Sequence, residues 1–169
     1  MPGAGKSSVG RQLARRLQVS FTDSDHVIEQ RLGCSIRSFF EREGEDRFRD
    51  VEAETIESLC ANDELGVLAT GGGAVLRPEN RRCLQSRCRV VYLHSTPDEV
   101  LRRVRHDANR PLLQVADPRQ RLRELYEVRD PLYRAAAHFV IETGRPSIPM
   151  LVNTIMMQLE MAQASPDGA

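Results

Sequence analysis

Apolar positions along the chain switch between helical and extended spacing, and this switching predicts an α/β protein. Val9, Leu13 and Leu17 recur at helical intervals, which indicates a helix from about Lys6 to Leu17. Four short apolar runs are typical of buried strands: 19–22, 67–70, 90–93 and 139–141. Further helices are expected at 27–32, 35–40, 45–60, 78–85, 97–105, 118–136 and 148–162. Strands that alternate with helices predict a parallel sheet covered by helices on both faces.

Length and charge limit the classes of function. A chain of 169 residues suits one domain with a real core, so we expect a single domain over residues 1–169 with a frayed tail at 165–169. The 24 basic and 24 acidic side chains balance, which gives no bulk attraction to nucleic acids or membranes. Neither a signal peptide nor a run of bilayer-spanning length is visible, so a cytoplasmic protein is expected.

The four cysteines predict neither a zinc site nor a disulfide framework. Cys34, Cys60, Cys83 and Cys88 form no Cys-x-x-Cys pair, and no histidine stands at zinc-ligand spacing. Their scatter is typical of reduced thiols in a cytosolic protein.

The opening segment carries the end of a phosphate-binding loop. The run Gly3-Ala4-Gly5-Lys6-Ser7-Ser8 completes the pattern G-x-x-x-x-G-K-[ST] and opens a helix. Glycines let backbone N–H groups wrap a phosphate, and the helix N-terminus adds partial positive charge. We therefore expect Lys6 to reach the β- and γ-phosphates of ATP and Ser7 to ligate Mg²⁺. A flexible start to an ordinary helix is the less favoured interpretation.

The first glycine of this motif would fall one residue before Met1. A buried strand precedes that glycine in P-loop folds, so we expect this strand to be missing from the chain. Losing about five buried apolar residues forfeits on the order of 10 kcal/mol of gross burial energy. Because whole domains are stable by only about 5–15 kcal/mol, the sequence as written is expected to be less stable and less active than one with the strand.

Asp23 and Asp25 follow the strand predicted at 19–22, at the edge where open α/β sheets bind ligands. Strand alternation would place both carboxylates on one side, with Ser24 facing away. One carboxylate can then hold Mg²⁺ through water while the other accepts the proton of an acceptor hydroxyl. A polar turn that caps the next helix explains the same three residues equally well.

Arginines and glycines supply the remaining candidates. Arg49 and Arg129 can bind a substrate carboxylate, because a planar guanidinium holds two oxygens at once, although each alone is more commonly a solvated helix residue. Gly71-Gly72-Gly73 follows a predicted strand, and three residues without side chains let a ligand approach the backbone; a plain loop is the alternative. The weakly periodic stretch 106–117 is expected to be a mobile loop.

In order and spacing, these segments resemble the shikimate kinase signature. The resemblance extends from Gly3 to Tyr133 and rests on Asp23-Ser24-Asp25, the run 33–52 (Gly-x-Ser-Ile-x-x-Phe-Phe-x-x-x-Gly-Glu-x-x-Phe-Arg-x-x-Glu), Leu68-Ala69-Thr70-Gly71-Gly72-Gly73, Arg110-Pro111-Leu112-Leu113 and Arg129-x-Pro131-Leu132-Tyr133. It implies a P-loop kinase fold with a mobile lid at about 106–117. It also implies phosphorylation of the 3-hydroxyl of shikimate by ATP with Mg²⁺, on the route to aromatic amino acids.

The resemblance further implies a role for each candidate. Substrate-binding residues would be Asp25, Arg49, Gly71, Gly72, Gly73 and Arg129, with the arginines on the shikimate carboxylate and Glu52 orienting Arg49. Asp25 would also act as the base, with Lys6 and Arg110 as its catalytic partners. Nucleotide-binding residues would be Gly3, Ala4, Gly5, Lys6, Ser7, Ser8, Arg110 and, as a weak candidate, Arg145. Ser7 and Asp23 would form the magnesium site.

Two other functions remain open at this level. A related P-loop kinase for gluconate or a nucleotide would share the phosphate loop, although the G-E-x-x-F-R and T-G-G-G segments favour shikimate. A nucleotide-binding module without catalysis is the second. Small-molecule substrates and a monomeric state are expected, without nucleic-acid or membrane partners.

Overall fold

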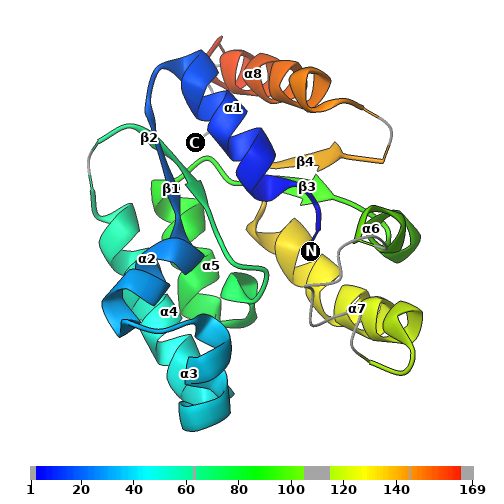
Figure 1. The fold of residues 1–169 in the computed structure, drawn as a ribbon. Coiled ribbons are helices and arrows are strands. Elements are labelled where there is room, and N and C mark those ends of the chain that lie inside the picture. The colour runs from blue at the N-terminus through cyan, green and yellow to red at the C-terminus, as the bar shows by residue number, and fades with distance from the viewer. Residues whose placement is uncertain (1–2, 63, 105–114, 145, 165–169) are drawn as a thin grey trace.

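The computed structural model describes residues 3–62, 64–104, 115–144 and 146–164 (Figure 1). The elements follow the order α1 (Lys6–Leu17), β1 (Ser20–Asp23), α2 (Ser24–Leu32), α3 (Ile36–Glu43), α4 (Glu45–Cys60), β2 (Gly66–Ala69), the 3₁₀ helix η1 (Ala74–Leu76), α5 (Pro78–Arg87), β3 (Val91–His94), α6 (Pro97–Val104), α7 (Pro118–Ala136), β4 (Phe139–Glu142) and α8 (Ile148–Ala164). Every predicted helix and strand is present, and the predicted bounds are wrong by a few residues only.

The strands pair in parallel, as predicted, but in two separate pairs. β1 lies beside β2, with Ser20 opposite Gly66, and β3 lies beside β4, with Val91 opposite Phe139 (Figure 1). The single sheet expected from the sequence is therefore divided in two. The division has a simple physical reason: among the described residues, no strand lies between β2 and β3 to carry the hydrogen bonds from one pair to the other.

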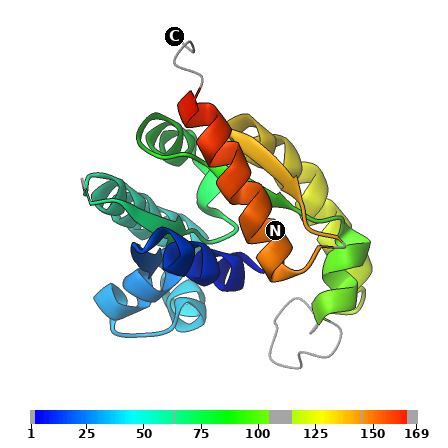
Figure 2. The ribbon, with the colours of Figure 1, turned by 90° about the horizontal axis from the view of Figure 1, so that it is seen from above.

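Helices cover both faces of the strands, as predicted. On one face α1 lies beside α8 (Figure 2), and their apolar side chains surround Leu93 of β3 and Ile141 of β4. Tyr92 points to the opposite face, where it packs with side chains of α6 and α7. Side chains alternate between the two faces along β2 as well. Val67 points to the α1 face, and its neighbour Leu68 packs near α4 and α5 on the other face.

The ends of several helices follow local sequence signals. Gly33 ends α2 with a φ of 66°, the left-handed conformation that glycine adopts most readily, and its N–H reaches the carbonyl of Glu29. Thr96 and Glu99 form reciprocal bonds at the start of α6, where the Glu99 N–H donates to Thr96 Oγ1 at 3.3 Å and the Thr96 N–H to Glu99 Oε2 at 2.9 Å. Thr96 therefore caps α6.

We predict that Leu122→Ala lowers the free energy of unfolding by about 2–5 kcal/mol, because it removes a buried side chain and leaves a cavity. Leu122 has no exposed surface and packs against Tyr92 and Val100. Leu65→Ala is the matched control, since Leu65 is 78% exposed and its truncation should change stability by no more than about 0.5 kcal/mol. Urea unfolding measures both variants, and equal losses would contradict the packing around α7.

Candidate functional site

The predicted phosphate loop has the backbone of an anion-binding turn. Gly3 and Gly5 have φ values of 77° and 82°, which other residues rarely adopt, and the two glycines flank the buried Ala4. Gly5 is the N-cap of α1, and the first N–H groups of the helix donate to no capping side chain. The first turn of α1 also contains no acidic residue. The positive end of this helix therefore faces the loop, and no acidic side chain of its own first turn offsets that charge.

Ser7 and Asp23 meet at the start of α1. The Ser7 hydroxyl donates to Asp23 Oδ2 at 2.9 Å, which leaves lone pairs of the serine oxygen available to a cation. The other carboxylate oxygen, Oδ1, accepts the N–H of Asp25 at 3.1 Å and caps α2. The capping interpretation of this segment is confirmed, because Asp23 Oδ1 caps α2, while Asp23 Oδ2 bonds Ser7 at the start of α1; the magnesium and base roles stay predictions.

The predicted orientation of Ser24 is wrong. Strand β1 ends at Asp23, and Ser24 and Asp25 form the first turn of α2, so the alternation of a strand does not apply to them. Ser24 is fully buried, and its Oγ accepts the N–H of Gly71 at 3.3 Å. Sequence spacing missed this bond because it joins segments that are 47 positions apart. Ser24 thereby fixes the glycine segment 71–73 next to Asp25.

Asp25 lies against this glycine segment in a half-buried position. A Cβ atom at Gly71 would stand 2.6 Å from Asp25 Oδ1 and 3.2 Å from Glu52 Oε1, so only glycine leaves room for both carboxylates. Burial, together with the negative charges of Asp23 and Glu52, raises the pKa of Asp25 to about 6. The charge of Lys6 acts in the opposite direction, which places this lysine within electrostatic reach of the carboxyl.

Arg49 is buried and held by two carboxylates of its own helix. Its Nη1 donates to Glu52 Oε2 at 2.5 Å, while Nε and Nη2 donate to Glu45 Oε1 at 3.2 and 3.0 Å. Burial acts to lower the pKa of Arg49, but the charge of Glu52 and the hydrogen bonds from both glutamates raise it overall. A Cβ atom at Gly73 would collide with the guanidinium. The sequence-based suggestion that Glu52 orients Arg49 matches this arrangement.

Arg129 and Tyr133 of α7 lie near the glycine segment 71–73 and the Arg49–Glu52 pair. The Tyr133 hydroxyl donates to the carbonyl of Gly72 at 2.6 Å. Burial raises the pKa of Glu52, and the positive charges of Arg49 and Arg129 oppose this rise. Arg129 therefore lies within electrostatic reach of the Arg49–Glu52 pair. Sequence reasoning assigned no role to Tyr133, although its position four residues after Arg129 on a predicted helix places both on one face.

The structure thus brings together most of the predicted residues. Three segments converge: the turn at Asp23–Asp25, the glycines 71–73 with Arg49 and Glu52, and Arg129 on α7. Arg110 and Arg145 lie outside the described residues, as do 106–114 of the predicted lid and the tail 165–169.

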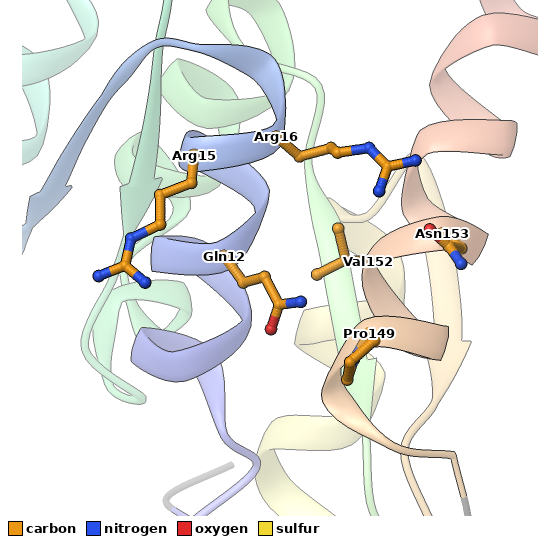
Figure 3. A pocket seen from close by; sticks show the side chains of 6 residues that line it. All are labelled: Gln12, Arg15, Arg16, Pro149, Val152 and Asn153. Carbon is orange, nitrogen blue, oxygen red and sulfur yellow. The ribbon is translucent and has the colours of Figure 1, made fainter.

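A hollow of about 330 Å³ elsewhere on the molecule contains none of these residues. It lies between α1 and α8 and is lined by Gln12, Arg15, Arg16, Pro149, Val152 and Asn153 (Figure 3). Arg15 and Arg16 belong to the last turn of α1, at the opposite end of that helix from Lys6. This hollow therefore does not mark the site, whose predicted residues gather at the N-terminal end of α1.

Comparison with known sequences identifies relatives of this chain. The family model described as shikimate kinase matches residues 2–160. The shikimate kinase of Paracidovorax citrulli is 60% identical over 168 residues, which cover 98% of this chain and 92% of that protein. The shikimate kinase of Burkholderia thailandensis is 59% identical over 160 residues, with coverage of 95% and 86%.

Solved structures support the same relationship and confirm the predicted P-loop α/β kinase fold. The structure of shikimate kinase from Acinetobacter baumannii in complex with shikimate has a TM-score of 0.88 at 46% identity and covers 95% of this chain and 89% of its own. Shikimate kinase from Aquifex aeolicus has a TM-score of 0.82 at 31% identity, with coverage of 95% and 92%.

We predict that Asp25→Asn stabilises the folded protein at pH 7 by about 1–3 kcal/mol. The folded carboxyl ionises at about pH 6, whereas an unfolded aspartate ionises near pH 4. The folded state therefore loses stability as the pH rises from about 4 to about 6, and asparagine removes this loss. Unfolding at pH 7 and pH 4 measures the gain, which should shrink at the lower pH. A pH-independent effect of the substitution would contradict the raised pKa.

Proposed function

The chain belongs to the shikimate kinase family, and we propose that its site transfers the γ-phosphate of ATP to the 3-hydroxyl of shikimate. The predicted family and kinase activity are confirmed by these relatives. The observation that carries the residue assignment is the convergence of Asp25, Arg49 and Glu52 on the glycine segment 71–73, next to the phosphate loop. The product would be shikimate 3-phosphate, on the route to aromatic amino acids.

Arg49 is proposed as the principal ligand of the shikimate carboxylate. A guanidinium has five N–H donors, and the bonds to Glu45 and Glu52 use three of them, so two remain, one on each terminal nitrogen. A carboxylate accepts such a pair with both oxygens. Arg129 supplies a second positive charge from α7. Because two glutamates already fix Arg49, little side-chain entropy would be lost when the substrate binds.

Asp25 is proposed to hold the ring hydroxyls and to accept the proton of the 3-hydroxyl. With a pKa of about 6, its carboxylate is ionised at neutral pH and is more basic than an ordinary aspartate. Gly71 and Gly72 have no side chains, so the acceptor can approach the backbone beside this carboxylate. Positioning the hydroxyl in line with the phosphate is the main demand of phosphoryl transfer.

The phosphate side would use Lys6 and the N–H groups of residues 3–8. Ser7 and Asp23 fit a magnesium site, because hydroxyl and carboxylate oxygens are the hard ligands that this ion prefers and both face the phosphate loop. Asp23 would act through a water molecule, since it already accepts the Ser7 hydroxyl. When bound, Mg²⁺ supplies neutralisation of phosphate charge. From the sequence, we propose that Arg110 of the lid adds charge stabilisation and that Arg145 approaches the adenine.

We further propose a monomer that works in the cytoplasm on ATP and shikimate, without nucleic-acid or membrane partners. Balanced charge supports this proposal, because it gives no general attraction to polyanions. In the part of the chain that the structure describes, no helix is long and apolar enough to cross a membrane.

We predict ADP release that requires ATP, Mg²⁺ and shikimate together in a coupled assay. Gluconate in place of shikimate should give no release above background, because it lacks the rigid ring that aligns a carboxylate with Arg49 and a hydroxyl with Asp25. Chelation of Mg²⁺ by EDTA should abolish the signal, and excess Mg²⁺ should restore it. Tight binding of ATP without transfer to any acceptor would contradict the proposal and favour a nucleotide-binding module.

We predict that Arg129→Ala weakens shikimate binding by about 10- to 100-fold, with a smaller effect on the KM for ATP, because it removes a charge-assisted contact to the carboxylate. Arg123→Ala is the matched control, since Arg123 lies on the same helix with an exposed side chain. Steady-state kinetics and calorimetry measure both variants. Unchanged shikimate affinity in Arg129→Ala would remove Arg129 from the carboxylate site.

A further inference from the structure

Two cysteines that are distant in sequence meet outside the proposed site. The Sγ atoms of Cys60 and Cys88 lie 3.7 Å apart, although the residues are separated by 28 positions. Cys60 is the last residue of α4, and Cys88 is the C-cap of α5. The scattered spacing that predicted reduced thiols gave no sign of this pair.

Packing of α4 against α5 holds the two thiols together. Both side chains are half-buried and lie against a cluster that contains the fully buried Ile56 of α4 and Leu84 of α5. The backbone N–H of Cys88 also donates to the carbonyl of Leu84 at 2.9 Å, which fixes the end of α5. The close approach of the sulfurs is therefore a consequence of the core and not of a loose surface encounter.

We propose that Cys60 and Cys88 form a reversible intramolecular disulfide when the protein meets an oxidised low-molecular-weight thiol such as glutathione disulfide. A disulfide has an S–S length of about 2.05 Å, so the two sulfurs need to approach by only about 1.6 Å. Rotation about the Cα–Cβ bonds can supply such a movement without unfolding either helix. The bond would join the end of α4 to the end of α5.

The reaction proceeds by two exchanges. The Cys88 thiolate attacks one sulfur of glutathione disulfide; the S–S bond breaks, and one glutathione leaves as a thiolate that takes up a proton. The Cys60 thiol then loses its proton, and its sulfur attacks Cys88, which releases the second glutathione. In total, two protein thiols give up two electrons and two protons, and one glutathione disulfide becomes two glutathione thiols.

The surroundings favour Cys88 as the attacking thiolate. The hydrogen bond from Cys60 and the charge of Arg87 lower the pKa of Cys88 to about 7, against the opposing effect of burial. An attacking thiol is most effective when its pKa lies near the ambient pH. The hydrogen bond with Cys88 and burial raise the pKa of Cys60, which suits the role of the second, resolving thiol.

Cys83 is the cysteine most able to compete with this pair for the oxidant. It lies on α5 and lines a surface hollow of about 400 Å³ between α4 and α5, so an oxidant can reach it. Cys34 belongs to a different cluster, with Ile28 and Phe39, and cannot reach the pair. These two residues provide matched Cys→Ser controls within the same chain.

The first experiment treats the whole protein with glutathione disulfide and maps its peptides under non-reducing conditions. Arginines separate Cys60, Cys83 and Cys88 in the sequence, so cleavage after arginine places each cysteine on a different peptide. A linked peptide that joins Cys60 to Cys88, and that dithiothreitol releases, is the expected product. Linkage through Cys83, or glutathione adducts without any linked peptide, would overturn the proposal.

The second experiment measures thermal unfolding of the oxidised and reduced protein. The link closes a long loop, so oxidation should raise Tm by about 5–10 °C. Cys60→Ser and Cys88→Ser should each abolish this increase, whereas Cys83→Ser and Cys34→Ser should keep it. An increase that survives in Cys88→Ser would overturn the assignment. The kinase activity plays no part in either readout, so the result is independent of the proposed function.

Discussion

The buried ion pair between Arg49 and Glu52 determines much of the architecture around the site. Removing two charges from water is costly, and the cost is offset only where geometry and further hydrogen bonds are favourable. Here the bond is short, Glu45 provides further acceptor contacts, and Gly73 leaves space for the guanidinium. The pair lies where α4 meets the glycine segment, so removing either partner would leave an uncompensated charge buried beside that segment.

The other parts of the site are arranged around the same pair. Ser24 of α2 accepts a hydrogen bond from Gly71, and Tyr133 of α7 donates one to Gly72. Together with α4, which carries the ion pair, these two helices meet at one short segment of backbone. Charged groups that are fixed before the ligand arrives need little reorganisation when charge moves, which is the electrostatic basis of much enzyme catalysis. Burial beside this segment, together with the charges of Asp23 and Glu52, also raises the pKa of Asp25. The ionised Asp25 carboxylate therefore lowers the stability of the folded protein, and the same environment makes this carboxylate more basic.

Periodicity and end signals were sufficient to predict the elements. The bounds of Lys6–Leu17 and Pro118–Ala136 match the predicted helices, because each has a clear apolar face and a defined start. The orientation of Ser24 was wrong because α2 begins at Ser24, three residues before the start predicted at residue 27. The bond from Tyr133 to Gly72 and the approach of Cys60 to Cys88 had no local signal. Such contacts arise from the packing of whole helices, which spacing along a chain does not encode.

The two oxygens of the Asp23 carboxylate have different partners, and they link two helices that are separate in the sequence. One oxygen caps α2 and the other accepts the hydroxyl of Ser7 in the first turn of α1, so a single rigid group spans both helix starts. A displacement of α1 relative to β1 would break the Ser7 hydrogen bond or turn the carboxylate away from the cap of α2. The first turns of α1 and α2 therefore form one mechanical unit, and the spacing between them is set by the length of a single carboxylate.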